Sequence, residues 1–110
     1  MRCAAEKRWS TVPDQAAARL AARVGGFVQG VGFRAYTEAT AANLGLTGWV
    51  RNTPGGEVEV LAEGSQDQLV KFLALLRRGP RASRVTYVEE TWGPATGEFS
   101  YFSVRSTYGD

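Results

Sequence analysis

The sequence predicts an α+β fold in which two helices cover one face of a mostly antiparallel sheet. Three observations carry this prediction. The chain has 110 residues, which is the length of a single domain. Hydrophobic residues make up 44% of it and charged residues 22%, as in an average globular protein with one core. Short segments of alternating polarity are interrupted by two segments with helical spacing, and their order defines the fold.

The first half of the chain contains a strand, a glycine-rich loop, a helix and a second strand. Leu20, Ala22 and Val24 occupy alternate positions, as expected of a strand with one buried face. An alanine-rich stretch that stops at Gly45 is typical of a helix, because glycine is favoured just after a helix end. The predicted elements are a strand at 19–26, a loop at 27–33, a helix at 34–44 and a strand at 46–52.

The second half begins with a tight turn and a strand in which glutamates alternate with small apolar residues. This alternation predicts a half-buried strand whose glutamate face, formed by Glu57, Glu59 and Glu63, is solvated. Ser65 and Gln68 have the spacing of a capping box, which marks a helix start. The apolar stripe of that helix is Leu69, Phe72, Leu73 and Leu76. The predicted elements are a turn at 53–56, a strand at 57–63, a helix ending at 78–80, and strands at 84–92 and 99–104.

The resulting order is β-α-β-β-α-β with an extra C-terminal strand, which is the ferredoxin-like arrangement. Residues 1–18 show no sustained period, so we expect a flexible N-terminal extension. The domain is predicted to span 19–106, and 107–110 form a short C-terminal tail.

Composition excludes several kinds of chemistry. The chain has no histidine, which removes the commonest general base and zinc ligand, and no cluster of carboxylates has ligand spacing. We therefore expect no metal and no cofactor. The single cysteine, Cys3, rules out an intrachain disulfide and favours a reducing compartment, the cytoplasm. A net charge of +2, dispersed arginines and the lack of long apolar runs predict a protein that binds neither nucleic acid nor membranes. We also expect a monomer.

The glycine-rich segment before the first predicted helix is the most unusual stretch of the chain. Free backbone N–H groups and the positive end of the helix dipole favour an anion there. Arg34 adds planar donors that suit phosphate, although glycines can also serve turn geometry alone. A phosphate-binding Walker loop is excluded, because Val31 occupies the position of its lysine.

A second candidate is Asn52, at the end of a predicted strand, where its side chain can face a site at the sheet edge. The alternative is that Asn52 only shapes the turn that follows at Thr53 and Pro54, a common role for asparagine.

Both stretches closely resemble signatures of the acylphosphatase family. Residues 24–34 match V-x-G-x-V-Q-G-V-G-F-R, and residues 48–64 match G-W-V-R-N-x-x-x-G-x-V-x-x-x-x-x-G, each with the spacing of the family. The resemblance extends over about residues 19–106. It departs at Phe27, where the family often has a basic or aliphatic residue, and this difference bears on substrate preference.

The resemblance implies an enzyme that hydrolyses the carboxyl–phosphate bond of small-molecule acyl phosphates and releases inorganic phosphate. Arg34 would hold the phosphoryl oxygens together with backbone N–H groups of the loop, and Asn52 would position the attacking water. The loop groups are those of Phe27, Val28, Gln29, Gly30 and Val31. The composition agrees independently, because a carboxylate whose acid has a pKa around 4 leaves without a general acid.

Two other hypotheses about function are compatible with the same fold. A non-catalytic ferredoxin-like module could bind RNA or a small anion through the glycine loop. A purely structural subunit would not require Arg34 and Asn52 together.

Overall fold

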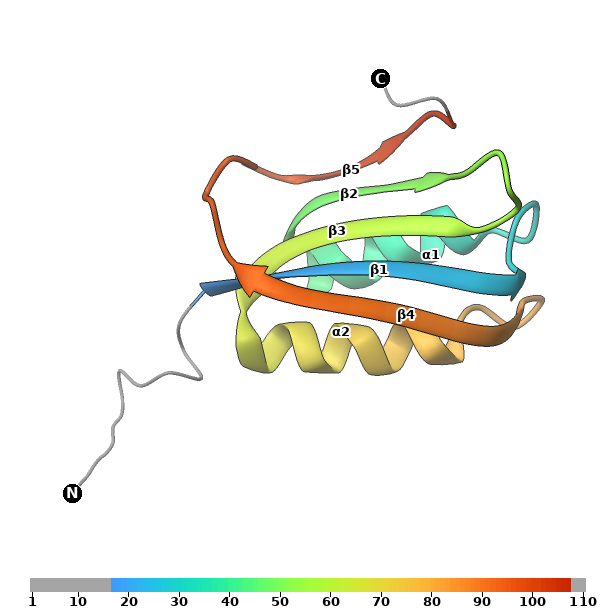
Figure 1. Cartoon of the computed structure of the whole chain (residues 1–110), viewed down its shortest axis with the longest axis horizontal. Coiled ribbons are helices and arrows are strands. Elements are labelled where there is room, and N and C mark those ends of the chain that lie inside the picture. The colour runs from blue at the N-terminus through green and yellow to red at the C-terminus, as the bar shows by residue number, and fades with distance from the viewer. Residues whose placement is uncertain (1–16, 108–110) are drawn as a thin grey trace.

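The computed structural model describes residues 17–107, and its elements follow the predicted order (Figure 1). The strands are β1 (Ala17–Phe27), β2 (Thr47–Asn52), β3 (Val58–Ser65), β4 (Arg84–Pro94) and β5 (Phe102–Arg105), and the helices are α1 (Phe33–Asn43) and α2 (Gln66–Arg78). The predicted extension at 1–18 lies outside the described residues except for Ala17 and Ala18, which open β1. Most of the predicted tail, at 108–110, also lies outside them.

All five strands belong to one sheet, in the order β4-β1-β3-β2-β5. Neighbouring strands are antiparallel, except that β5 runs parallel to β2 at the sheet edge. Both helices lie on the same face of the sheet, and no helix of the described residues covers the other face (Figure 1). The predicted ferredoxin-like α+β sandwich with an extra C-terminal strand is therefore confirmed.

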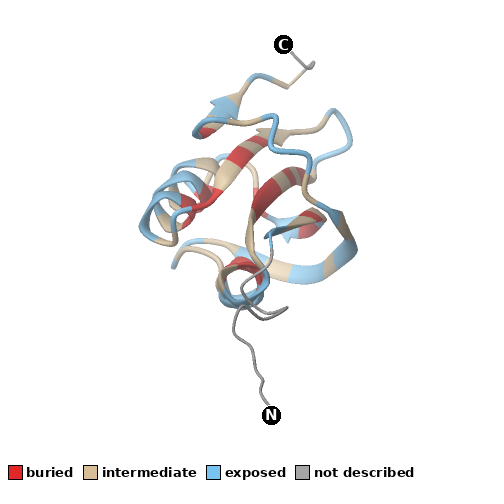
Figure 2. Ribbon diagram, turned by 90° about the vertical axis from the view of Figure 1, so that its left-hand side faces the viewer, coloured by how far each residue is buried: buried red, intermediate tan, exposed pale blue. Residues whose placement is uncertain are grey.

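The core fills the space between the helices and the sheet (Figure 2). The predicted stripe of α2 is buried in full: Leu69, Phe72, Leu73 and Leu76. The facing strands contribute the apolar side chains Leu20, Val24, Val50, Val58 and Val60. Each fully buried aliphatic or aromatic side chain stabilises the fold by roughly 1.5–3 kcal/mol. This packing fixes which strand ends lie next to the start of α1.

The start of α2 shows only half of the predicted capping box. Ser65 Oγ accepts a hydrogen bond from the backbone N–H of Gln68 at 3.3 Å, as predicted. The reciprocal bond is absent from the described part of the chain, where the buried Gln68 Oε1 has no hydrogen-bond partner. Ser65 also closes β3 opposite Ala17, so its backbone belongs to the strand ladder.

The prediction of a fully solvated glutamate face on β3 is wrong at Glu63, which is only 4% exposed. The cause is the sheet order: β4 and β5 lie at opposite edges, so the connection between them must cross one end of the sheet. This connection donates the backbone N–H groups of Thr96 and Gly97 to the Glu63 carboxylate. The same connection is longer than predicted, so the last strand begins at Phe102 and not at residue 99.

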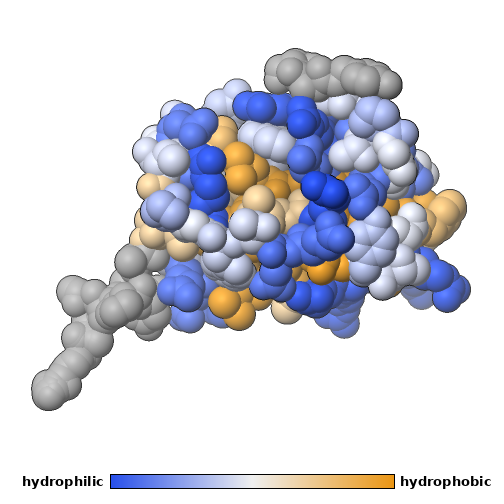
Figure 3. Space-filling view, in the orientation of Figure 1, coloured by the Kyte–Doolittle hydropathy of each residue, from blue (hydrophilic) through white to orange (hydrophobic). Residues whose placement is uncertain are grey.

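The face of the sheet without helices carries apolar surface bordered by hydrophilic side chains (Figure 3). No helix in the described range, 17–107, is long and apolar enough to span a membrane.

Candidate active site

The glycine loop connects the end of β1 to the start of α1, and its backbone leaves amide groups free. The register between β1 and β4 shifts at Gly25–Gly26, a bulge directly before the loop. Gly32 is the N-cap of α1 in a left-handed conformation (φ 81°), and without a side chain it cannot cap the helix. Within residues 17–107, no backbone carbonyl accepts from the N–H groups of Gln29, Gly30 or Val31. The loop therefore offers several donors beside the positive end of a helix dipole.

Arg34 is the second residue of α1, so the fold fixes its charge at the same helix start. Among the residues that the structure describes, Arg34 has no carboxylate within ion-pair distance. Arg19 and Arg51, by contrast, are each paired with a glutamate at 2.7–2.8 Å. The first turn of α1 contains no acidic residue either. The positive charge at this site is available for an anion.

Asn52 closes β2, where it lies opposite Val58 of β3. It lines a pocket of about 170 Å³ together with Arg34 and residues of the loop and the first helical turn. These other lining residues are Val28, Gly30, Gly32, Phe33 and Ala35. The two residues that the sequence predicts to be catalytic are thus brought to one pocket.

The remaining predicted contact residues do not line this pocket. Phe27 is the last residue of β1 and its side chain is 62% exposed. Val31 is packed in part against the core. The side chain of Gln29 turns towards the β2–β3 turn, where it donates to the carbonyl oxygens of Thr53 and Glu57.

Sequence reasoning omitted three lining residues, Gly32, Phe33 and Ala35, although all lie at the predicted helix start. The sequence could have identified these residues as pocket residues. They lie at the first turn of a helix that follows a glycine loop, and the amides of such a turn lack partners in the helix. The residues next to Gln29 in the sequence do not predict what its side chain contacts, because its partners lie 24 and 28 residues further along the chain.

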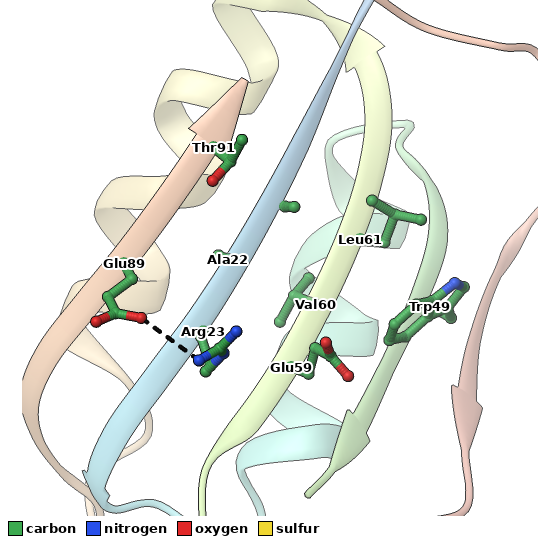
Figure 4. Close-up of a pocket in the computed structure, with 9 residues that line it drawn as sticks. Ala22, Arg23, Trp49, Glu59, Val60, Leu61, Glu89 and Thr91 are labelled. Carbon is green, nitrogen blue, oxygen red and sulfur yellow. Dashed lines mark ion pairs between the residues drawn. The ribbon is translucent and has the colours of Figure 1, made fainter. Parts of the chain in front are cut away.

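A second pocket, of about 190 Å³, lies on the sheet face without helices (Figure 4). The charged side chains that line this pocket already form ion pairs. Arg23 lies 3.6 Å from Glu57 and 3.7 Å from Glu89, and Glu59 accepts from Arg51 at 2.8 Å. With its arginine neutralised and two carboxylates in its lining, this pocket is poorly suited to phosphate.

The described residues contain no group of three or more histidine, cysteine, aspartate or glutamate side chains that could hold a metal ion. The donors of the pocket are instead a guanidinium, a carboxamide and backbone amides. Such a set can bind a phosphoryl group and orient a water molecule.

Comparison with known proteins agrees with this geometry. The sequence model of the acylphosphatase family matches residues 20–104. A Nocardia farcinica protein named acylphosphatase is 48% identical over 87 residues, covering 79% of this chain and 87% of that protein. An acylphosphatase from Thermus thermophilus is 51% identical over 79 residues, covering 72% and 90%. The crystal structure of acylphosphatase from Bacillus subtilis superposes with a TM-score of 0.78 at 35% identity, covering 80% of this chain and 98% of that one. The chain therefore belongs to the acylphosphatase family.

Proposed function

We propose that this chain hydrolyses the carboxyl–phosphate bond of acyl phosphates, giving a carboxylate and inorganic phosphate. The observation that carries the proposal is the pocket itself, which combines Arg34, a loop with free amides and Asn52. The family and the names of its members support the same reaction.

Arg34 and the loop amides bind the phosphoryl group in this scheme. The guanidinium supplies planar donors to two phosphoryl oxygens, and the N–H groups of residues 27–31 surround the others. Because the transferring phosphoryl group keeps its negative charge, these fixed donors stabilise the transition state without having to reorient.

Asn52 positions the attacking water. A carboxamide does not titrate near neutral pH, but its oxygen can accept a hydrogen bond from water while its NH₂ group donates. The water must attack in line with the departing carboxylate, so the placement of Asn52 governs the rate more than the affinity. The carboxylate departs unprotonated, and no general acid is required.

The oligomeric state, the cellular location and the partners of the chain are also part of the proposal. We propose that the chain acts as a monomer in the cytoplasm and does not bind nucleic acid. The single cysteine supports the cytoplasm, and the modest net charge of +2 supports the lack of nucleic-acid binding. Size-exclusion chromatography with light scattering tests the monomer.

Kinetics of Asn52→Ala with benzoyl phosphate test the function. We expect kcat to fall on the order of 100-fold, the scale for losing one positioned catalytic group, with much less change in the affinity for inorganic phosphate. Asn52→Asp should also be slow, since a carboxylate repels the anionic substrate. The matched control is Asn43→Ala, at the exposed end of α1, which should retain the wild-type rate.

Two outcomes contradict this scheme. A destabilised but fully active Asn52→Ala variant would mean that Asn52 only shapes the turn. A wild-type protein that binds phosphate but leaves benzoyl phosphate intact would be an anion-binding module and not an enzyme.

A further inference from the structure

The two halves of the pocket come from separate segments, and the side chain of Gln29 joins them. Gln29 Nε2 donates to the carbonyl oxygen of Thr53 at 2.9 Å and to that of Glu57 at 2.8 Å. An amide NH₂ has two hydrogens, so both are used by these bonds. Gln29 belongs to the phosphate-binding loop, and Thr53 directly follows Asn52. The connection therefore runs from the phosphate-binding half to the water-positioning half.

The turn that Gln29 holds is closed by its own hydrogen bonds. The backbone N–H of Thr53 donates to Glu57 O at 2.9 Å, and Thr53 Oγ1 accepts from the Glu57 N–H at 3.1 Å. Gly56 N–H donates to Thr53 O at 3.2 Å. A turn with this many internal bonds moves as one unit, so a restraint on its two ends also restrains the adjacent Asn52.

The same turn is anchored on its other side through the Glu57 side chain. Tyr87 of β4 donates its hydroxyl hydrogen to the Glu57 carboxylate, reaching across β1 at Gly25. A Cβ atom on Gly25 would overlap the ring carbons of Tyr87, so glycine is needed for the ring to cross. Arg23, 3.6 Å from the carboxylate, adds a contact from β1. The turn is thus held against the strand that leads into the loop.

We propose that Gln29 is a positioning residue, which fixes Asn52 relative to the phosphate-binding loop through its two side-chain hydrogen bonds. The inference rests on the proposed function and assigns this role to a side chain that does not line the pocket. Its effect is on the rate, because misplacing a reacting group by about 1 Å can cost on the order of 100-fold. Phosphate binding depends on the loop amides and Arg34, which the connection leaves in place.

The test is Gln29→Met, which keeps the length of the side chain and removes its donors. Each carbonyl retains a second partner, Thr53 N–H for Glu57 O and Gly56 N–H for Thr53 O, so we expect the variant to fold. With benzoyl phosphate, kcat should fall on the order of 10- to 100-fold, while KM and the inhibition constant of inorganic phosphate change less than about 3-fold. The matched control, Gln66→Met, lies at the exposed first residue of α2 and should show the wild-type kcat.

A double-mutant cycle with Asn52→Ala then separates positioning from general damage. If Gln29 acts through Asn52, Gln29→Met should lower kcat by less than about 2-fold in the Asn52→Ala background. Independent, multiplicative losses in the cycle would overturn the inference. So would equal losses of kcat and phosphate affinity in Gln29→Met, or a wild-type kcat.

These failures differ from a failure of the proposed function. In each of them the wild-type protein still hydrolyses benzoyl phosphate, and only the role of Gln29 is lost. If the wild-type protein does not hydrolyse it, the proposed function fails and the positioning role fails with it.

Discussion

Glu63 is the buried carboxylate that we expect to make this fold sensitive to acid. It accepts hydrogen bonds from Arg19 Nε at 2.7 Å, Thr96 N at 2.9 Å, Gly97 N at 3.0 Å and Thr96 Oγ1 at 3.1 Å. Burial by itself raises the pKa of Glu63, but the bonds from Thr96, Arg19 and Gly97 outweigh it and lower the pKa to about 2. These bonds favour the charged form in the folded state.

The size and sign of the effect follow from this pKa. The folded-state pKa of about 2 lies below the ordinary value of 4.5. The carboxylate therefore contributes stability that is fully present above about pH 4.5 and is lost as the pH falls through 2. The difference between the two pKa values corresponds to roughly 3 kcal/mol of unfolding free energy. That is a large share of the roughly 5–15 kcal/mol that stabilises a typical domain.

Urea unfolding of the wild type and Glu63→Gln between pH 7 and pH 2 tests this prediction. The glutamine has nearly the same shape but no charge. Its NH₂ group replaces one carboxylate oxygen and therefore faces the N–H groups that donate to Glu63. We expect it to unfold about 3 kcal/mol more easily at pH 7, with the gap closing towards pH 2 as the wild-type carboxylate is protonated. Glu38→Gln, on an exposed position of α1, is the control and should show no such gap. A gap that does not change with pH would refute the electrostatic reasoning.

Three further predictions concern the site and the N-terminal end of the chain. Arg34→Lys keeps the charge but loses the planar donors, so kcat/KM should fall on the order of 100-fold and inhibition by phosphate should weaken in parallel; normal turnover would exclude a phosphate-binding role for Arg34. Hydrolysis should persist in excess EDTA, and loss of activity that magnesium or zinc restores would contradict a metal-free reaction. Deleting residues 1–16 leaves β1 complete, so activity should stay within a few-fold and unfolding free energy within about 1 kcal/mol; failure to fold would assign these residues to the core.

The fold was predictable because its signals are local. The alternation of Leu20, Ala22 and Val24 marks β1, and the apolar stripe of α2 has the 3.6-residue period of a helix. All of these side chains are buried where the periodicity places them. The meeting of the glycine loop and Arg34 in one pocket was predictable for the same reason, because the loop and Arg34 are contiguous in the sequence.

The parts that sequence reasoning missed depend on distant partners. Glu63 has the same local pattern as Glu59, yet Glu63 is buried because a segment more than thirty residues away crosses it. The amide of Gln29 pairs with a turn that only the packing of β1 beside β3 brings near. Alternating polarity tells which face of a strand points outward, but not whether another segment covers that face.

The edge position of β5 divides the molecule into regions of different local stability. β5 has four residues and, among the described strands, pairs with β2 alone, whereas the other edge strand, β4, has eleven residues, so we expect the backbone hydrogen bonds of β5 to open most readily. Its main contact with the core is Phe102, whose ring packs edge-on against the ring of Phe72 with 6.1 Å between the ring centroids. Asn52 is the residue of β2 just beyond this pairing, and it stays paired with β3 when β5 opens. The C-terminal strand can therefore fray and re-form in the native protein without dismantling the pocket.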